Sequence, residues 1–298
     1  MRGRSNRLNA VDQGTRAAET GLPPPPGSDL SGNWISSAEA FLIDLDGTLI
    51  QDDQVMQGGA EMLDRLSGKF VIVSNNSTDT ADILACRLHA LGLPVVGRQL
   101  VLAGEQTIRF LAERHAGCRV ILFADEMLRR MAMDCGLTLV DRNADLVVLM
   151  RDRSFDYAKL SLAANELRAG ARLVVSNPDR THPAPRGGIV VETGALMQAV
   201  TACSGVSPLR IVGKPEPDLF AEALRRLSAM PDTAMVIGDN LDTDARGAVR
   251  LGMRYLMIGS GADAASPREL LALPGRGHFA IPVQNEHEPL GRATIGDL

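Results

Sequence analysis

Short apolar runs alternate with longer amphipathic stretches along the chain from residue 39 onward. Each run is too short for a helix and is typical of a buried strand. The predicted strands are Ala40–Ile43, Phe70–Ser74, Arg119–Phe123, Asp145–Met150, Arg172–Ser176, Leu209–Val212, Ala234–Ile237 and Tyr255–Ile258. Helix-like patterns lie between them, at 60–66, 80–91, 104–114, 157–169, 216–227 and 243–251. Strands that alternate with crossover helices predict an α/β fold with a mainly parallel, doubly wound sheet.

The two ends of the chain have a different character from this α/β region. Residues 1–38 are rich in Gly, Ser and Asn and contain the run Pro23-Pro24-Pro25-Pro26-Gly27, a composition that favours extended or disordered backbone. We expect a poorly ordered N-terminal arm at 1–38, with a short docking segment around Leu30 to Ile35 as the alternative. Residues 281–298 are expected to form a C-terminal tail.

Polar sequences follow four of the predicted strands, at the strand ends where ligands bind in a doubly wound sheet. These sequences are Asp44-Leu45-Asp46-Gly47-Thr48, Ser74-Asn75-Asn76-Ser77-Thr78, Gly213-Lys214-Pro215 and Gly238-Asp239-Asn240-Leu241-Asp242-Thr243-Asp244. Any one of them could be an ordinary turn or helix cap, since Asp, Asn and Ser are common there. Four together, each after an apolar strand, are hard to explain as caps and predict a shared site.

Paired carboxylates at this site point to phosphoryl transfer. One carboxylate of the pair Asp44 and Asp46 can act as a nucleophile that forms an aspartyl-phosphate, which divides one hydrolysis into two easier steps. The second carboxyl can give a proton to the leaving alkoxide and later take one from water. Because two carboxylates and a phosphate dianion repel one another, the site requires a cation, and carboxylate oxygens suit Mg²⁺. Asp239 is the natural additional metal ligand.

The other residues of these motifs supply positive charge and hydrogen bonds. Lys214 can stabilise both the nucleophile and the transferring phosphoryl group. Ser74 and Asn75 can donate hydrogen bonds to phosphoryl oxygens from their side chains and backbone, and Asn76 of the same turn joins them as a phosphate-binding candidate. Asp244 is placed either to hold Lys214 or a metal-bound water, or simply to complement a helix dipole.

The four motifs resemble those of the haloacid dehalogenase (HAD) superfamily of phosphohydrolases, over about residues 39 to 275. The segments Asn177-Pro178-Asp179 and Glu192-Thr193-Gly194-Ala195-Leu196 are similar to subfamily IIA, which contains NagD-type, 4-nitrophenyl, phosphoglycolate and pyridoxal phosphatases. The resemblance implies a Rossmann-like core, with Asp44 as nucleophile and Mg²⁺ ligand. It further implies that Asp46 is the general acid/base and a ligand through its backbone carbonyl, and that Asp239 is a ligand. In the same way it implies that Ser74, Asn75 and Lys214 bind the phosphoryl group.

The spacing of the motifs predicts where a second domain is inserted. Only one helix and one strand fit between Asp44 and Ser74, whereas the interval from Asn76 to Lys214 is far longer than a crossover needs. We expect a core domain at 39–116 and 193–280 and an inserted domain at 117–192. The resemblance implies that this insert is an α/β cap of the C2 type, which closes over the site and selects the substrate.

The cap sequence gives two hints about the substrate. The resemblance places His182 near a substrate-contacting position of pyridoxal-phosphatase-like members, although a loop histidine can equally be solvated. The expected cap holds few aromatic residues, Phe123, Phe155 and Tyr157, so a large ring would have little to stack against. We therefore favour small or sugar-like phosphates over pyridoxal phosphate.

Composition excludes several other classes of partner. There are 31 basic and 36 acidic residues, which gives a net charge of −5 and argues against non-specific nucleic-acid binding. No apolar run is long enough to span a bilayer, and no apolar segment follows the basic N-terminus. We therefore expect a cytoplasmic protein that binds neither nucleic acid nor membrane, with a homodimer left open.

The sequence as a whole predicts a Mg²⁺-dependent phosphomonoester hydrolase that acts on a small phosphorylated metabolite, such as a sugar phosphate or phosphoglycolate. A pyridoxal-phosphate phosphatase and a catalytically weak or regulatory phosphate-binding protein remain as alternatives. Three other classes fit less well. A dehalogenase would need neither Asp46 nor a metal, and phosphomutases of this type carry their cap between the first two motifs, where this chain has no room. Response-regulator receivers, which combine similar acids, Ser/Thr and Lys on a parallel sheet, lack a large insert.

Overall fold

The computed structural model describes residues 34–184 and 188–273. The predicted C-terminal tail and most of the predicted arm lie outside the described residues. The last part of the expected arm, however, is folded: Trp34–Ser37 forms a short 3₁₀ turn, and the Trp34 side chain is buried. The Trp34 Nε1 donates to the Leu270 carbonyl over 3.1 Å, so the ordered core begins before residue 38.

A five-stranded parallel sheet forms the centre of the core lobe, in the order β14-β13-β1-β4-β5. The strands are β1 (Ala40–Ile43), β4 (Phe70–Ser74), β5 (Leu100–Leu102), β13 (Ala234–Gly238) and β14 (Arg254–Met257). The prediction of a doubly wound parallel sheet is confirmed. β5 was not predicted, because its three residues are too few to show a pattern.

Helices cover both faces of this sheet because alternate strand residues point to opposite sides. Phe41 and Ile43 pack in the apolar cluster on the side of α2 (Gly59–Arg65), α3 (Ala81–Ala90) and α10 (Pro267–Ala272). Ala40 and Leu42 pack in the cluster on the side of α8 (Pro217–Leu227) and α9 (Arg246–Arg250). The sheet is therefore buried on both faces.

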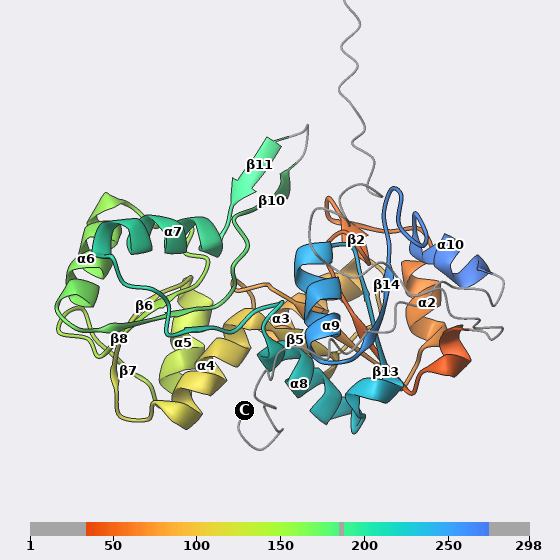
Figure 1. Cartoon of the computed structure of the whole chain (residues 1–298), viewed down its shortest axis with the longest axis horizontal. Coiled ribbons are helices and arrows are strands. Elements are labelled where there is room, and N and C mark those ends of the chain that lie inside the picture. The colour runs from red at the N-terminus through yellow and green to blue at the C-terminus, as the bar shows by residue number, and fades with distance from the viewer. Residues whose placement is uncertain (1–33, 185–187, 274–298) are drawn as a thin grey trace, which may run out of the picture.

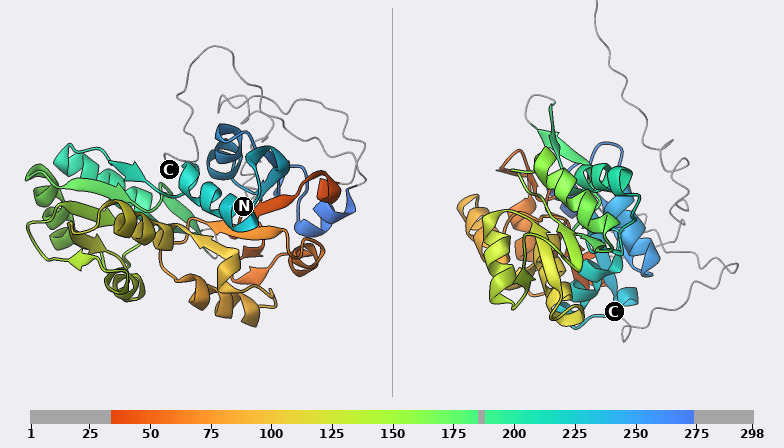
Figure 2. Two further views of the ribbon diagram at one scale, coloured as in Figure 1. Left: turned by 90° about the horizontal axis from the view of Figure 1, so that it is seen from below. Right: turned by 90° about the vertical axis from the view of Figure 1, so that its left-hand side faces the viewer.

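A second five-stranded parallel sheet forms the cap lobe, in the order β12-β9-β8-β6-β7. The strands are β6 (Arg119–Phe123), β7 (Thr138–Leu139), β8 (Leu146–Leu149), β9 (Arg172–Val175) and β12 (Arg210–Ile211). Its helices are α4 (Ala103–Arg114), α5 (Glu126–Asp134), α6 (Tyr157–Arg168) and α7 (Thr193–Ser204). The two lobes lie side by side along the long axis of the molecule (Figures 1 and 2).

A two-stranded antiparallel hairpin, β10 (Thr181–Ala184) and β11 (Gly188–Val191), rises from the cap beside the core lobe (Figure 1). The remaining elements are short: β2 (Ile50–Gln51), β3 (Gln54–Val55), the 3₁₀ turns η2 (Gly97–Gln99) and η4 (Pro231–Thr233), and one π-helical turn, η5 (Leu241–Ala245). Among the described residues, no helix is long and apolar enough to cross a membrane.

The contacts extend the cap beyond the expected range of 117–192. The helix α7 packs on α6 and contributes Val200 to the apolar cluster of the cap, and β12 pairs with β9. On the other side, Ile108 and Leu111 of α4 pack in the second apolar cluster of the cap. Assigning residues from 193 onward to the core therefore differs from the structure, in which the chain returns to the core only after β12.

Candidate active site

The site begins where β1 ends. Asp44 is the first residue after the strand, and its side chain is 9% exposed. The chain then turns through Gly47, which has a φ of +80° and leaves no room for a side chain: a Cβ there would lie 2.1 Å from Asp239 Oδ2. Glycine at this position therefore allows the turn after β1 to lie directly against the end of β13.

Lys214 enters the site from the segment that returns from the cap. Its side chain is 3% exposed, and Nζ donates to Asp44 Oδ1 over 2.5 Å and to Asp244 Oδ1 over 2.7 Å. Burial alone would lower the pKa of Lys214, but the carboxylates of Asp244 and Asp44 raise it above its ordinary value. Lys214 is therefore a fixed cation between two buried acids.

Three carboxylates converge at this point. Oxygens of Asp44, Asp239 and Asp244 lie within 4.8 Å of one another. Desolvation and the neighbouring acids raise the pKa of Asp239 to about 8 and that of Asp244 to about 6, in both cases against the opposing charge of Lys214. One lysine does not balance three acids, and the donors are hard carboxylate oxygens, so the cluster fits a divalent cation such as Mg²⁺ or Ca²⁺.

Asp46 differs from Asp44 in being exposed to solvent. The protein around it nevertheless raises the pKa of its carboxyl through desolvation, while the charges of Lys214 and His182 act to lower it. Glu192 and Asp179 of the cap add to the increase. Of the two acids Asp44 and Asp46, Asp46 is therefore the one that faces both solvent and the cap.

The polar turn after β4 contains residues that we predicted to bind phosphate. Ser74 is buried, and its Oγ accepts from the Asn76 backbone N–H over 3.1 Å. The Asn76 side chain closes its own turn: Oδ1 accepts from Thr78 N and Asp79 N at 2.9 Å, and Nδ2 donates to Asp79. The hydrogen-bond partners of the Asn76 side chain therefore all lie within its own turn.

Asn75 connects three segments through its side chain. Nδ2 donates to Asp179 Oδ2 over 3.0 Å and to the Lys214 carbonyl over 3.2 Å, and Oδ1 accepts from Lys214 N over 2.7 Å. Both polar atoms of the side-chain amide therefore have protein partners. The Asn75 side chain positions Lys214 and ties the core to the cap, and the contact of Asn75 with phosphate stays a prediction.

Residues of the cap that the sequence reasoning did not assign a role line the same region. The predicted candidate His182 lies on β10, with Nδ1 at 2.7 Å from Glu192 Oε1. Glu192 also forms an ion pair with Arg151, with Nε to Oε1 at 3.0 Å. Arg151, Asp179 and Glu192 follow the ends of β8, β9 and β11. Applying the strand-end rule to the parallel sheet of the cap would have found Arg151 and Asp179, whereas Glu192 follows a strand of the antiparallel hairpin.

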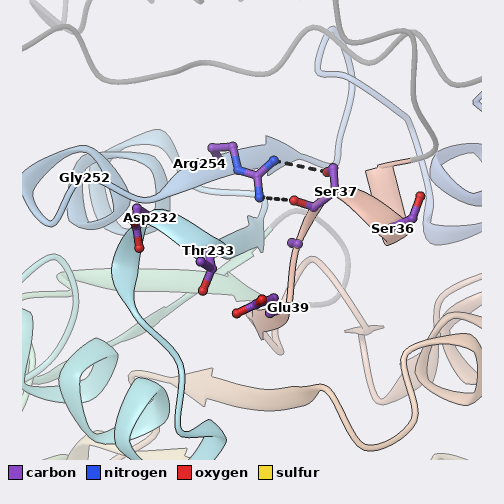
Figure 3. Close-up of a pocket in the computed structure, with 8 residues that line it drawn as sticks. Ser36, Ser37, Glu39, Asp232, Thr233, Gly252 and Arg254 are labelled. Atoms are coloured by element: carbon purple, nitrogen blue, oxygen red, sulfur yellow. Dashed lines mark hydrogen bonds between the residues drawn. The ribbon is translucent and has the colours of Figure 1, made fainter.

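The pocket in Figure 3 lies at the opposite end of the core sheet, before β1, β13 and β14 begin. It has a volume of about 530 Å³ and is lined by Glu39, Asp232 and Arg254 among others. The Arg254 guanidinium donates to the side-chain and backbone oxygens of Ser37 (Figure 3). Because this pocket is remote from the carboxylate cluster, we do not assign the chemistry to it.

Comparison with known proteins gives consistent matches. A family model described as haloacid dehalogenase-like hydrolase matches residues 41–138, and a HAD-hydrolase-like model matches 211–282. The chain is 30% identical to a dihydroxyacetone phosphatase of Corynebacterium glutamicum over 225 residues, which cover 74% of this chain and 81% of that protein. It is 34% identical to a D-glycerol 3-phosphate phosphatase of Mycobacterium tuberculosis, over 76% of this chain and 64% of that protein.

Solved structures agree with these sequence matches. The crystal structure of the glycerol phosphate phosphatase of M. tuberculosis in complex with magnesium superposes with a TM-score of 0.70 at 33% identity, over 76% of this chain and 69% of that one. The same enzyme has also been solved in complex with calcium.

Proposed function

The chain belongs to the haloacid dehalogenase-like hydrolases, and on that basis we propose how it acts as a phosphomonoester hydrolase on small phosphorylated metabolites. The observation that carries the proposal is the position of Lys214 between Asp44 and Asp244, with Asp239 beside them. This arrangement combines a nucleophile, a fixed cation and a set of oxygen ligands at the end of β1.

Asp44 is the nucleophile in this proposal. One of its carboxylate oxygens forms a bond to phosphorus while the bond from phosphorus to the leaving-group oxygen breaks, and Asp46 gives its proton to that oxygen. Water then attacks the phosphorus of the aspartyl-phosphate and gives its proton to Asp46. The bond to Asp44 breaks, and inorganic phosphate and the regenerated carboxylate result.

Lys214 and the acid cluster prepare the site for an anionic substrate. Lys214 keeps Asp44 in place and places a positive charge next to the transferring phosphoryl group. We propose Mg²⁺ as the cation, held by Asp44 and Asp239, with the Asp46 backbone carbonyl as a further ligand and Asp244 holding Lys214. When bound, the ion neutralises negative charge that develops on the phosphoryl oxygens.

The substrate is proposed to be a small polyol or sugar phosphate. The aromatic residues of the cap do not form a stacking platform: Phe123 is buried and packs edge-to-face on Phe155 at 5.3 Å, and Tyr157 is 88% exposed at the start of α6. The named activities of the relatives, on dihydroxyacetone and glycerol phosphates, agree with this choice.

The test is phosphate release from 4-nitrophenyl phosphate and from a panel of phosphorylated metabolites, with Mg²⁺ and with a chelator, by the wild type and by Asp44→Asn. We expect turnover only in the wild type with metal, and the fastest metabolite to be a polyol or sugar phosphate. Wild-type activity no higher than that of Asp44→Asn would contradict the hydrolase assignment. Fastest turnover of pyridoxal phosphate would overturn the substrate assignment alone.

A further inference from the structure

We infer that Arg151, Glu192 and His182 of the cap form the subsite for the leaving group, and that it selects uncharged, hydroxyl-bearing leaving groups over carboxylates. The inference rests on the proposed function, because it concerns what is attached to the phosphate. We refer to these three residues as the Glu192 cluster.

The cluster is built around one carboxylate oxygen. Glu192 Oε1 lies 3.0 Å from Arg151 Nε and 2.7 Å from His182 Nδ1. The side chain of Glu192 is 12% exposed, that of Arg151 26% and that of His182 43%. The three groups are therefore held by one another and yet remain accessible to a small molecule.

A single core residue anchors two sides of the cluster. Ser77, three residues after the end of β4, is buried, and its Oγ accepts from the Arg151 backbone N–H over 3.1 Å. The same Oγ lies 3.3 Å from the hydroxyl of Thr193, the residue after Glu192. Asn177 donates to Ser77 Oγ as well, over 3.1 Å. The Glu192 cluster is thus fixed relative to the turn that carries Ser74.

We place the cluster on the leaving-group side of the site, because Ser77, in the turn that carries Ser74, holds both Arg151 and Thr193. The charges of His182 and Glu192 also affect the pKa of Asp46, the residue proposed to protonate the leaving-group oxygen. Asp44, the proposed nucleophile, lies on the other side of the phosphate in an in-line displacement. A group attached to the leaving oxygen therefore extends from Asp46 toward the cap and meets the Glu192 cluster.

The charges of the cluster favour hydroxyls. Arg151 and Glu192 cancel in charge, and the acids Asp46 and Asp179 nearby offset the positive charge of His182. A hydroxyl can donate to a Glu192 oxygen and accept from the guanidinium of Arg151 at the same time, since a guanidinium has five donors. A carboxylate on the leaving group would accept from Arg151 but would be repelled by the carboxylate of Glu192. Such repulsion between like charges weakens the binding of a substrate that carries a carboxylate.

The test compares glycerol 3-phosphate with 3-phosphoglycerate, which carry a hydroxymethyl group and a carboxylate at the far end. The measured quantity is the ratio of kcat/KM for glycerol 3-phosphate to that for 3-phosphoglycerate. We expect a ratio above one in the wild type and a fall of about tenfold in Glu192→Gln. In Arg151→Gln the ratio should rise, because the negative charge of Glu192 then has no arginine partner and repels the carboxylate substrate more strongly. Glu126→Gln, which removes an exposed cap ion pair with Arg130, is the matched control and should keep the wild-type ratio.

Opposite changes of the ratio in the two variants are diagnostic, because general damage to the cap would lower kcat/KM for both substrates alike and leave the ratio unchanged. An unchanged ratio in both variants, a shift in the same direction, or a wild-type ratio below one would overturn the inference. Turnover of 4-nitrophenyl phosphate is measured in every variant. If even the wild type does not hydrolyse it, the proposed function fails, which is distinct from an active enzyme whose ratio does not change.

Discussion

Replacing Gly47 by alanine should disturb the site more than the fold. Gly47 has a φ of +80°, and a Cβ there would lie 2.1 Å from Asp239 Oδ2 and 2.6 Å from Asp239 Cγ. The chain offers a matched control in Gly68, which has a φ of +78° but no atom within 4 Å of the added Cβ. Both substitutions carry the backbone cost of an alanine in the left-handed region, about 1–2 kcal/mol.

The difference between the two variants isolates the displacement of Asp239. A carboxylate at the end of a side chain moves aside at little cost, so the free energies of unfolding of Gly47→Ala and Gly68→Ala should be similar in urea denaturation without metal. Function should differ, because disturbing the support of a metal site costs about 10–100-fold in affinity or activity. We expect kcat/KM for 4-nitrophenyl phosphate to fall in Gly47→Ala by an amount in this range, with a higher Mg²⁺ requirement.

A Gly47→Ala enzyme with the activity and Mg²⁺ requirement of Gly68→Ala would contradict this prediction. Such a result would mean that Asp239 does not need the position it has in this structure. Loss of activity in both variants to the same extent would point to a general effect of the left-handed alanine and would also count against the proposed role of Asp239.

Three further predictions follow from the same site. Asp46→Asn should slow an alkyl phosphate about 10²–10⁴-fold and 4-nitrophenyl phosphate much less, since nitrophenolate departs without a proton; equal losses in steady-state kinetics would contradict its role as acid. Lys214→Met leaves the buried Asp44 and Asp244 facing each other and should destabilise the metal-free protein by about 3–5 kcal/mol; an unchanged urea midpoint would refute this. Desolvation and neighbouring acids raise the pKa of Asp239 to about 8 and that of Asp244 to about 6, from 3.8. Because the folded state then binds more protons than the unfolded state, the stability of the metal-free protein should fall as the pH rises through this window. Thermal melts with a chelator should show that fall and melts with saturating Mg²⁺ should not; a melting temperature that rises with pH in the chelator would contradict it.

The strands of both sheets were largely predictable because their apolar runs are distinct. Ala40–Ile43, Phe70–Ser74 and Arg119–Phe123 have the same bounds in the structure. The sheet to which a strand belongs was less predictable. The run at β12 is equally compatible with either sheet, and only its pairing with β9, a contact distant in sequence, assigns it to the cap.

The side chains that meet at the site were predictable from strand-end position, but their partners were not. The turn after β4 contains two adjacent asparagines, and the sequence gives both the same expected role. The structure distinguishes them: Asn76 closes its own turn, whereas Asn75 bridges Lys214 and Asp179. Asp179 lies 104 positions further along the chain, so the bridge depends on how the lobes meet, which no local pattern encodes.

The central claim is that Asp44 accepts the phosphoryl group, and its most direct test is to trap that intermediate. Wild-type protein, Asp44→Asn and Asp46→Asn are mixed with 4-nitrophenyl phosphate and Mg²⁺, quenched in acid within the first turnover, and digested for peptide mass spectrometry. We expect the added mass of one phosphoryl group on the peptide that carries Asp44 in the wild type. We also expect this phosphorylated peptide to accumulate in Asp46→Asn, where water attack lacks its base, and no added mass in Asp44→Asn. Phosphate release by an active enzyme with no modified Asp44 peptide, or with the label on another residue, would contradict it.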